Sequence, residues 1–177
     1  YRGYAGQIIS GTYKKGELIT ILPQNIETTI SMVETAGTEV DEVFANQPAV
    51  LHLAEDIDVS RGDYFVKSNN LPRVEQEFEA VVCWLDKKEL NEGNKYFLQH
   101  KSKLIKAIVK EIEFKMDVNT LEKIPVTSSV TLNEVVRVKI KTASPVVFDS
   151  FENNVSTGSA ILIDETSNAT VGALMFV

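Results

Sequence analysis

The segment Val136-Arg137-Val138-Lys139-Ile140-Lys141 decides the fold class. Apolar and basic residues alternate in it, so three apolar side chains point to one face of a strand and three basic side chains to the other. This pattern is typical of a half-buried strand with a basic outer stripe. Comparable short apolar or alternating runs, separated by Gly, Pro, Asn and Asp, fill the rest of the chain. Together they predict an all-β protein of barrels or sandwiches, with almost no helix.

Two other segments of the second half have less regular patterns. Ala80–Leu85 is continuously apolar, which is typical of a strand buried on both faces, and we expect Cys83 and Trp84 to pack there. Apolar surroundings disfavour the reactive thiolate, so we expect Cys83 to be inert. In Lys103–Met116 the apolar residues have helical spacing first and strand spacing later, so the pattern alone leaves helix and strand open.

The first half of the chain predicts several short strands. Tyr4–Tyr13 and Glu17–Leu22 flank a Lys-Lys-Gly turn in which Gly16 can supply a positive φ, so we expect a hairpin there. The next predicted strand, Ile26–Val33, alternates in polarity. One of its faces then carries Ile26, Thr28, Ile30 and Met32.

Length and composition fit either one large β domain or two small ones. The chain has 177 residues, 44% of them hydrophobic and 24% charged. The polar stretch Lys67–Arg73 predicts a boundary between two domains, residues 1–70 and 71–177. No apolar run approaches the roughly 20 residues that cross a bilayer, no signal peptide opens the chain, and one cysteine forms no internal disulfide. We therefore expect a cytoplasmic protein that does not contact a membrane.

The charge distribution is uneven. A formal net charge of −7 argues against a nucleic-acid-binding protein. Residues 95–141 nevertheless hold 10 basic and 5 acidic side chains, a net of +5. This positive region is either a face that meets an acidic partner or an ordinary solvated strand surface.

No motif of catalysis or nucleotide binding is present. The sequence has no G-x-x-x-x-G-K-[ST] phosphate loop, no G-x-S-x-G elbow and no H-E-x-x-H zinc motif. His52 lies in a predicted apolar strand, and we expect it to be structural. For His100 we expect a structural place at the rim of a barrel, with a contact role as the alternative. We predict no catalytic, cofactor-binding or metal-binding residue in this chain, and no enzymatic activity of its own.

One acidic segment deserves a test as a cation site. Its carboxylates are Glu55, Asp56, Asp58 and Asp63. The segment begins like a calcium loop, but Gly62 falls one place late and Lys67 stands where a bidentate Glu belongs. We therefore expect a solvated turn, in which Gly62 of the adhesion-like tripeptide Arg-Gly-Asp lets the chain bend tightly.

Motifs along the whole chain resemble those of one family. The first half carries Arg2-Gly3-Tyr4-Ala5-Gly6, Ser10-Gly11 and Ser60-Arg61-Gly62-Asp63. The second half carries Gln99-His100-Lys101, Asp117-Val118-Asn119-Thr120-Leu121, Leu132-Asn133-Glu134, Ile161-Leu162-Ile163-Asp164-Glu165-Thr166 and Asn168-Ala169-Thr170-Val171-Gly172-Ala173. In this order they resemble the two barrel domains that follow the GTPase domain in the large subunit of bacterial sulfate adenylyltransferase, a branch of the elongation-factor-Tu-like GTPases. The resemblance implies two consecutive antiparallel barrels, with Lys103–Met116 as a strand.

The resemblance also implies that this part of the protein has a non-catalytic role. In that family the small subunit converts ATP and sulfate to adenosine 5′-phosphosulfate and pyrophosphate, and the large subunit drives the step by hydrolysing GTP. The barrels are then expected to dock the GTPase domain and the small subunit, while GTP and Mg²⁺ belong to the GTPase domain outside this fragment. Tyr1 falls within the family's first barrel strand, so we expect that strand to be incomplete. The alternative function is a tRNA-contacting barrel module of a translational GTPase. The acidic total charge of this chain argues against that alternative.

Overall fold

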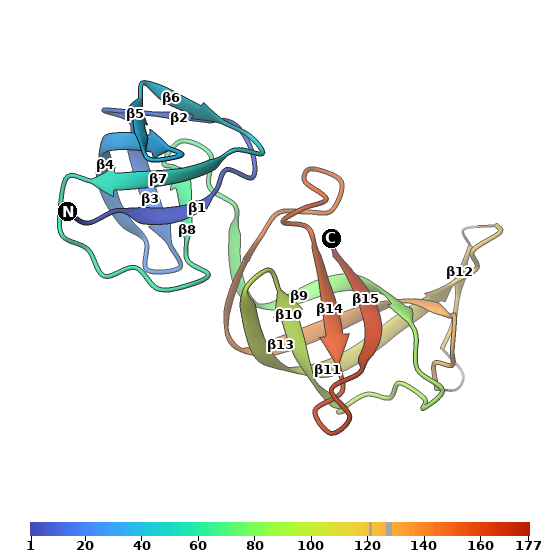
Figure 1. Ribbon diagram of the computed structural model, residues 1–177. Helices are drawn as coiled ribbons and strands as arrows, with labels where there is room; N and C mark the ends of the chain where they lie inside the picture. Colours follow the sequence, from blue (N-terminus) through green and yellow to red (C-terminus); the bar gives the residue numbers. More distant parts are fainter. Residues whose placement is uncertain (121, 127–128) are drawn as a thin grey trace. The chain divides into compact units, whose positions relative to one another are not determined.

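The computed structural model describes residues 1–120, 122–126 and 129–177, and all regular secondary structure among them is β-strand, which confirms the predicted all-β class. The chain forms two compact units, Tyr1–Pro72 and Arg73–Val177 (Figure 1). Leu121, the last residue of the predicted Asp-Val-Asn-Thr-Leu motif, lies outside the described residues. In the described part of the chain, no helix has the length and apolar character needed to cross a membrane.

The first unit is an antiparallel sheet with a small ribbon beside it. Its strands are β1 (Tyr4–Gln7), β2 (Thr12–Lys14), β3 (Leu18–Leu22), β4 (Ile26–Thr35), β5 (Thr38–Val40), β6 (Glu42–Phe44), β7 (Pro48–Leu53) and β8 (Tyr64–Lys67). The sheet has the order β1-β7-β4-β3-β8 with β5 paired to β4, and β2 and β6 form the ribbon. Sheet and ribbon share one core of Ile8, Ile19, Ile30, Val33, Val43, Ala49 and Leu51.

The hairpin predicted around Gly16 is wrong in its pairing. The predicted strand Tyr4–Tyr13 is broken into β1 and β2, because Gly11 between them has a φ of +72° and redirects the chain. As a result β2 pairs with β6, while β3 pairs with β4 and β8. Gly16 does have the predicted positive φ, at +83°.

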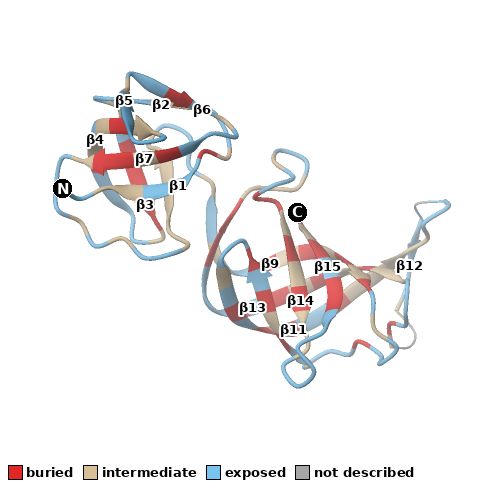
Figure 2. Ribbon diagram, in the orientation of Figure 1, coloured by how far each residue is buried: buried red, intermediate tan, exposed pale blue. Residues whose placement is uncertain are grey.

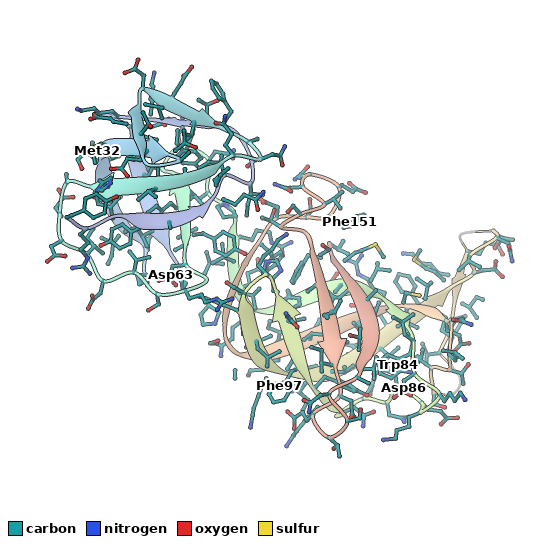
Figure 3. The ribbon with its side chains drawn as sticks, viewed as in Figure 1. Met32, Asp63, Trp84, Asp86, Phe97 and Phe151 are labelled. Atoms are coloured by element: carbon teal, nitrogen blue, oxygen red, sulfur yellow. The ribbon has the colours of Figure 1, made fainter. Side chains whose placement is uncertain are left out.

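The predicted grouping of Ile26, Thr28, Ile30 and Met32 on one face of β4 is also wrong at its end. The pairing of β4 with β7 contains a register shift between Ile30 and Met32. Such an irregularity moves the following side chains to the opposite face of the strand. Val33 is therefore fully buried in the core, and Met32 (labelled in Figure 3) lies only half-buried outside it.

The second unit is a closed barrel of six strands. The strands of this unit are β9 (Arg73–Trp84), β10 (Lys95–His100), β11 (Lys103–Met116), β12 (Lys123–Ile124), β13 (Val135–Phe148), β14 (Ser159–Ile163) and β15 (Thr170–Phe176). All of them except β12 form the ring, in the order β10-β14-β15-β9-β13-β11, and the pairing of β10 with β11 closes it. The ends of β11 and β13 extend beyond the ring, and β12 pairs there with β11 (Figure 1). Lys103–Met116 is thus a strand over its whole length.

Alternation along the strands builds the core of this barrel. Along β9 and β13 buried and more exposed residues follow one another, as Figure 2 shows. At one end of the core Trp84 is 1% exposed, and its Nε1 donates a hydrogen bond to the Lys88 carbonyl at 2.7 Å. In the same core the rings of Phe148 and Phe176 stack with centroids 4.2 Å apart. Each fully buried Phe contributes about 1.5–3 kcal/mol by leaving water.

Candidate functional surfaces

A ladder of ion pairs covers part of the outer face of the second barrel. The Arg137 guanidinium on β13 binds the carboxylate of Glu79 on β9, and its Nε lies 3.7 Å from Oε2 of Glu113 on β11. The next outward residue of β13, Lys139, places its Nζ 3.3 Å from Oε2 of Glu111. We call Glu79, Glu111, Glu113, Arg137 and Lys139 the charged ladder. The basic stripe predicted on β13 is therefore largely neutralised by carboxylates on the two neighbouring strands.

Proton affinities within the charged ladder follow from these contacts. The hydrogen bond from Arg137 holds the pKa of the Glu79 carboxyl below its usual value of 4.5. The hydrogen bond with Glu111 raises the pKa of Lys139. Both groups consequently remain charged at neutral pH, and their fields largely cancel. A surface of this kind offers little attraction to a polyanion such as a nucleic acid.

A shallow depression lies on the same side of the barrel. Its volume is about 370 Å³, and it is lined by Arg73, Glu75, Glu77, Phe78, Glu79, Lys139 and Val177. Within it Arg73 makes a two-pronged contact with Glu75, from Nε and from Nη2, both at 2.9 Å. The lining contains no histidine, cysteine or hydroxyl side chain, so it has neither a nucleophile nor a proton shuttle for neutral pH.

His100 is a structural residue by its surroundings. Its side chain is 3% exposed, with Nδ1 3.0 Å from the Ser159 carbonyl oxygen and Nε2 3.0 Å from the Val147 carbonyl oxygen. Burial lowers the pKa of this imidazole, although both carbonyls oppose the change. The neutral ring has one N–H and can donate to only one of the two carbonyls. This buried position leaves no ring nitrogen directed at solvent.

His52 forms a small cluster with two residues of the first unit. Its Nε2 lies 3.2 Å from Oε1 of Glu34, and the Tyr1 hydroxyl donates to the other carboxylate oxygen at 2.7 Å. A Cβ on Gly3 would lie 2.4 Å from Cγ1 of Val50 and 3.0 Å from Cε1 of His52. The glycine of the Arg-Gly-Tyr motif is thus required by the close approach of β1 to β7.

The carboxylates of the acidic segment after β7 are engaged by other side chains of the first unit. Arg2 binds Asp56, and its Nη2 lies 3.1 Å from Oδ1 of Asp58. Asp63 accepts a hydrogen bond from Nε2 of Gln24 at 2.7 Å, and Gly62 before it turns the chain with a φ of +90°. Across residues 1–120, 122–126 and 129–177, no group of three or more His, Cys, Asp or Glu side chains could hold a metal ion.

One structural ion pair was not anticipated from the sequence. Lys115, next to the last residue of β11, places its Nζ 2.9 and 2.8 Å from the two carboxylate oxygens of Glu134 and 3.1 Å from the Ser129 carbonyl oxygen. Burial raises the pKa of Glu134, but hydrogen bonds from Lys115 and the Thr131 amide outweigh it and lower the value overall. The Leu-Asn-Glu motif indicated that Glu134 mattered, but no local pattern pointed to its partner 19 residues away.

The arrangement of strands in the second unit agrees with a comparison against known families. Residues 77–176 match the family described as GTP-eEF1A C-terminal domain-like. The chain belongs to this family. Among solved structures, 99% of this GTP-eEF1A C-terminal domain-like chain superposes on 45% of Sup35 complexed with GDP, with a TM-score of 0.86 and 19% identity. Similarly, 97% of this chain superposes on 38% of the apo form of elongation factor SelB from Methanococcus maripaludis, with a TM-score of 0.77 and 16% identity. At these identities the likeness shows the fold alone, and it confirms barrels of the elongation-factor type.

Closer sequence relatives carry more specific names. The bifunctional enzyme CysN/CysC of Mycobacterium tuberculosis is 38% identical over 176 residues, which are 99% of this chain and 29% of that protein. Sulfate adenylyltransferase subunit 1 of Buchnera aphidicola subsp. Acyrthosiphon pisum is 38% identical over all 177 residues and 37% of its own length. The same subunit of Teredinibacter turnerae is 35% identical over 38% of its length. The predicted resemblance is confirmed, and the chain spans only about a third of these relatives.

Proposed function

We propose that this chain is the non-catalytic barrel region of the GTP-binding regulatory subunit of sulfate adenylyltransferase. The whole protein would stimulate formation of adenosine 5′-phosphosulfate and pyrophosphate from ATP and sulfate, driven by GTP hydrolysis. Within it, residues 1–70 and 71–177 are the second and third domains. They serve as a scaffold against which the GTPase domain and the small subunit dock. GTP and Mg²⁺ bind in the GTPase domain, and the complex works in the cytoplasm.

The observation that carries this proposal is the match to proteins named subunit 1 of sulfate adenylyltransferase over the full chain, at 35–38% identity. The chemistry of the surface is consistent with a scaffold. The two described histidines contact a carboxylate or backbone carbonyls within their own unit, and the carboxylates of the charged ladder are paired with cations. Such a surface is better suited to binding another protein than to catalysis.

The proposal is tested by binding to the small subunit. The tagged 177-residue chain and the small subunit of sulfate adenylyltransferase are mixed, and the complex is measured by calorimetry and by size-exclusion chromatography. A stoichiometric complex is expected. No binding at tens of micromolar would contradict the docking role, because a stable interface requires a Kd well below that range. The corresponding barrel region of a translational GTPase serves as the matched control.

The alternative, a tRNA-contacting module, is supported by the fold shared with SelB and by the positive charge of residues 95–141. Against it, Arg137 and Lys139 are engaged by Glu79 and Glu111. A filter-binding titration with tRNA at several salt concentrations separates the two functions. Phosphate contacts would give an affinity that falls steeply with salt, whereas the scaffold function predicts no saturable binding.

A further inference from the structure

Next to the charged ladder, the outer face of the second barrel changes from charged to apolar. On β9 the outward residues are Glu75, Glu77 and Glu79, followed by Val81 and Cys83, with Leu85 directly after the strand. The cross-strand register continues the change onto the neighbouring strands. Cys83 pairs with Ala173 and Val135, and these in turn pair with Ile161 and Met116. With their neighbours they form the outer apolar face: Val81, Cys83, Leu85, Phe114, Met116, Val135, Ile161, Ala173 and Met175.

This face is only partly covered by the chain itself. Leu85 is 44% exposed, Ala173 is exposed, and the other members of the outer apolar face are half-buried. The intervening inward residues Val82 and Trp84 are 0% and 1% exposed. One face of an antiparallel sheet usually meets water through polar side chains. The doubly apolar stretch Ala80–Leu85 predicts burial on both faces, and the barrel provides burial on one.

A single cation stands at one margin of the outer apolar face. Lys123 pairs with Met116 in the register, and its Nζ lies 4.7 Å from the centroid of the Phe114 ring. Among the described residues no carboxylate makes an ion pair with it. Arg137, which the register places between Val81 and Phe114, is already engaged by Glu79 and Glu113. Lys123 is therefore the one charge of this surface that a partner could neutralise.

We propose that the outer apolar face docks a second protein subunit, through an aliphatic surface that carries a carboxylate opposite Lys123. This inference rests on the proposed function, in which that subunit is the small subunit of sulfate adenylyltransferase. An apolar centre with a charged rim is the usual anatomy of a stable interface. Such an interface contains about 20–30 residues from each partner, so the nine residues of this face would form its centre.

Charge argues against a second copy of this chain as the occupant. In a two-fold dimer the same patch serves both partners, so Lys123 of each copy needs a carboxylate from the patch itself. The nine residues of the outer apolar face include no carboxylate, and self-association through carboxylates beside the face is one of the outcomes tested below. A different protein can supply the missing charge, and in doing so it gains specificity.

Cys83 offers a direct probe, because it is the only cysteine of the chain and lies in the middle of the outer apolar face. The rate of its alkylation by iodoacetamide is followed by mass spectrometry, for the native chain alone and with the small subunit. With the small subunit at about ten times its Kd, alkylation should slow by about tenfold. A Cys83→Ser, Lys141→Cys variant, which carries the thiol on the charged part of β13, should be alkylated at the same rate in both samples.

Binding of variants provides a second measurement. Met175→Glu places a charge within the outer apolar face and should weaken binding of the small subunit by at least about tenfold, and Lys123→Glu should weaken it through repulsion. Lys141→Glu is the matched control on the exposed, charged part of the sheet and should bind as the parent chain does. Thermal unfolding of each variant shows whether the barrel remains folded.

The outcomes separate this inference from the proposed function. If the small subunit binds the parent chain but leaves Cys83 alkylation unchanged, the face is not the docking surface, although the scaffold function stands. If the parent chain does not bind the small subunit at all, both proposals fail. Protection of Cys83 that rises with the concentration of the chain alone would assign the face to self-association. Protection seen only in a longer protein that includes the GTPase domain would assign it to that domain, and either result would overturn the proposal.

Discussion

The two parts of the second barrel's outer surface share strands β9, β11 and β13 but carry different kinds of outward side chain. In the charged ladder, Arg137 and Lys139 pair with carboxylates on the neighbouring strands, so the charges of that part are compensated within the chain. In the outer apolar face, Cys83 and Val135 occupy equivalent positions on β9 and β13 and have no polar atom to offer water except a weak thiol. The inward side chains are equally apolar behind both parts. The packing of the barrel core thus requires apolar residues on the inner face of each strand. On the outer face, the residue type depends on what contacts that face, water or another protein.

The largest test of this comparison contrasts two neighbouring residues of β9. Trp84→Ala should destabilise the chain by about 3–5 kcal/mol, because the buried indole leaves a cavity in the core. Cys83→Ala, on the opposite side of the strand, should change the free energy of unfolding by less than about 0.5 kcal/mol. Urea unfolding followed by circular dichroism measures both. A large loss in Cys83→Ala would mean that the outer apolar face belongs to the chain's own core.

A smaller effect is expected where the two parts meet. Arg137→Met keeps most of the side-chain volume but leaves the partly buried carboxylates of Glu79 and Glu113 unpaired, and should cost about 1 kcal/mol. A double-mutant cycle with Glu79→Gln isolates the coupling between the two side chains. A coupling energy of zero would show that the ion pairs of the charged ladder do not stabilise the chain, and the two parts of the surface would then not differ in their contribution to stability.

Acid should act on the barrel in two separate ranges. Burial holds the pKa of His100 below its ordinary value of 6.5, so as pH falls below that value the unfolded chain takes up the proton first. The stability is therefore complete above this range and falls as the solution is acidified towards the folded-state pKa. His100→Gln should flatten the curve of unfolding free energy between about pH 7.5 and 5.5. A curve that rises on acidification would contradict the burial of a neutral imidazole.

The charged ladder should respond only at lower pH. The Arg137 hydrogen bond lowers the pKa of Glu79 in the folded chain, so its contribution is present above the ordinary value of 4.5 and is lost as pH falls below it. Glu79→Gln should accordingly lower the unfolding free energy by a constant amount at neutral pH, without changing the slope of the curve there, and should flatten only its acid limb. The same urea titrations, repeated at each pH for this variant and for His100→Gln, distinguish the two ranges.

The smallest effect is expected for Lys139→Met. Its ion pair with Glu111 joins side chains that are 34% and 55% exposed, and such surface pairs are screened by water and salt. The urea midpoint should not move measurably, and added salt should not change that result. A clear loss of stability at low salt would show that the ladder acts as a network and not as separate pairs.

Local patterns were sufficient for much of this fold. Alternation at Val136–Lys141 and the turn residues between short runs predicted the all-β class, and the positive φ of Gly16 followed from its place in a turn. The pattern could not tell that β2 leaves β3 for β6, because that pairing depends on a bend at Gly11 and on a strand 30 residues away. It could not place Met32 outside the core either, because a bulge is a property of two strands together.

The candidate surfaces were less accessible to sequence reasoning. The basic stripe on β13 was visible, but the carboxylates that neutralise Arg137 and Lys139 lie on β9 and β11, up to 58 residues away. The apolar stretch Ala80–Leu85 indicated two covered faces without showing that the barrel covers one. Likewise no local pattern indicated that both nitrogens of His100 lie against backbone carbonyls of β13 and β14.

The pairing of β10 with β11 limits how any protein can attach to the second unit. Because the ring is complete, the six strands of the described barrel present no free row of backbone amides and carbonyls to a visiting strand. Adding a strand, a common way for sheets to capture peptides, is therefore closed to these six strands, whereas the two-residue strand β12 outside the ring pairs only with β11. Recognition on the ring has to occur through side chains, where a single substitution can change the choice of partner without disturbing the backbone.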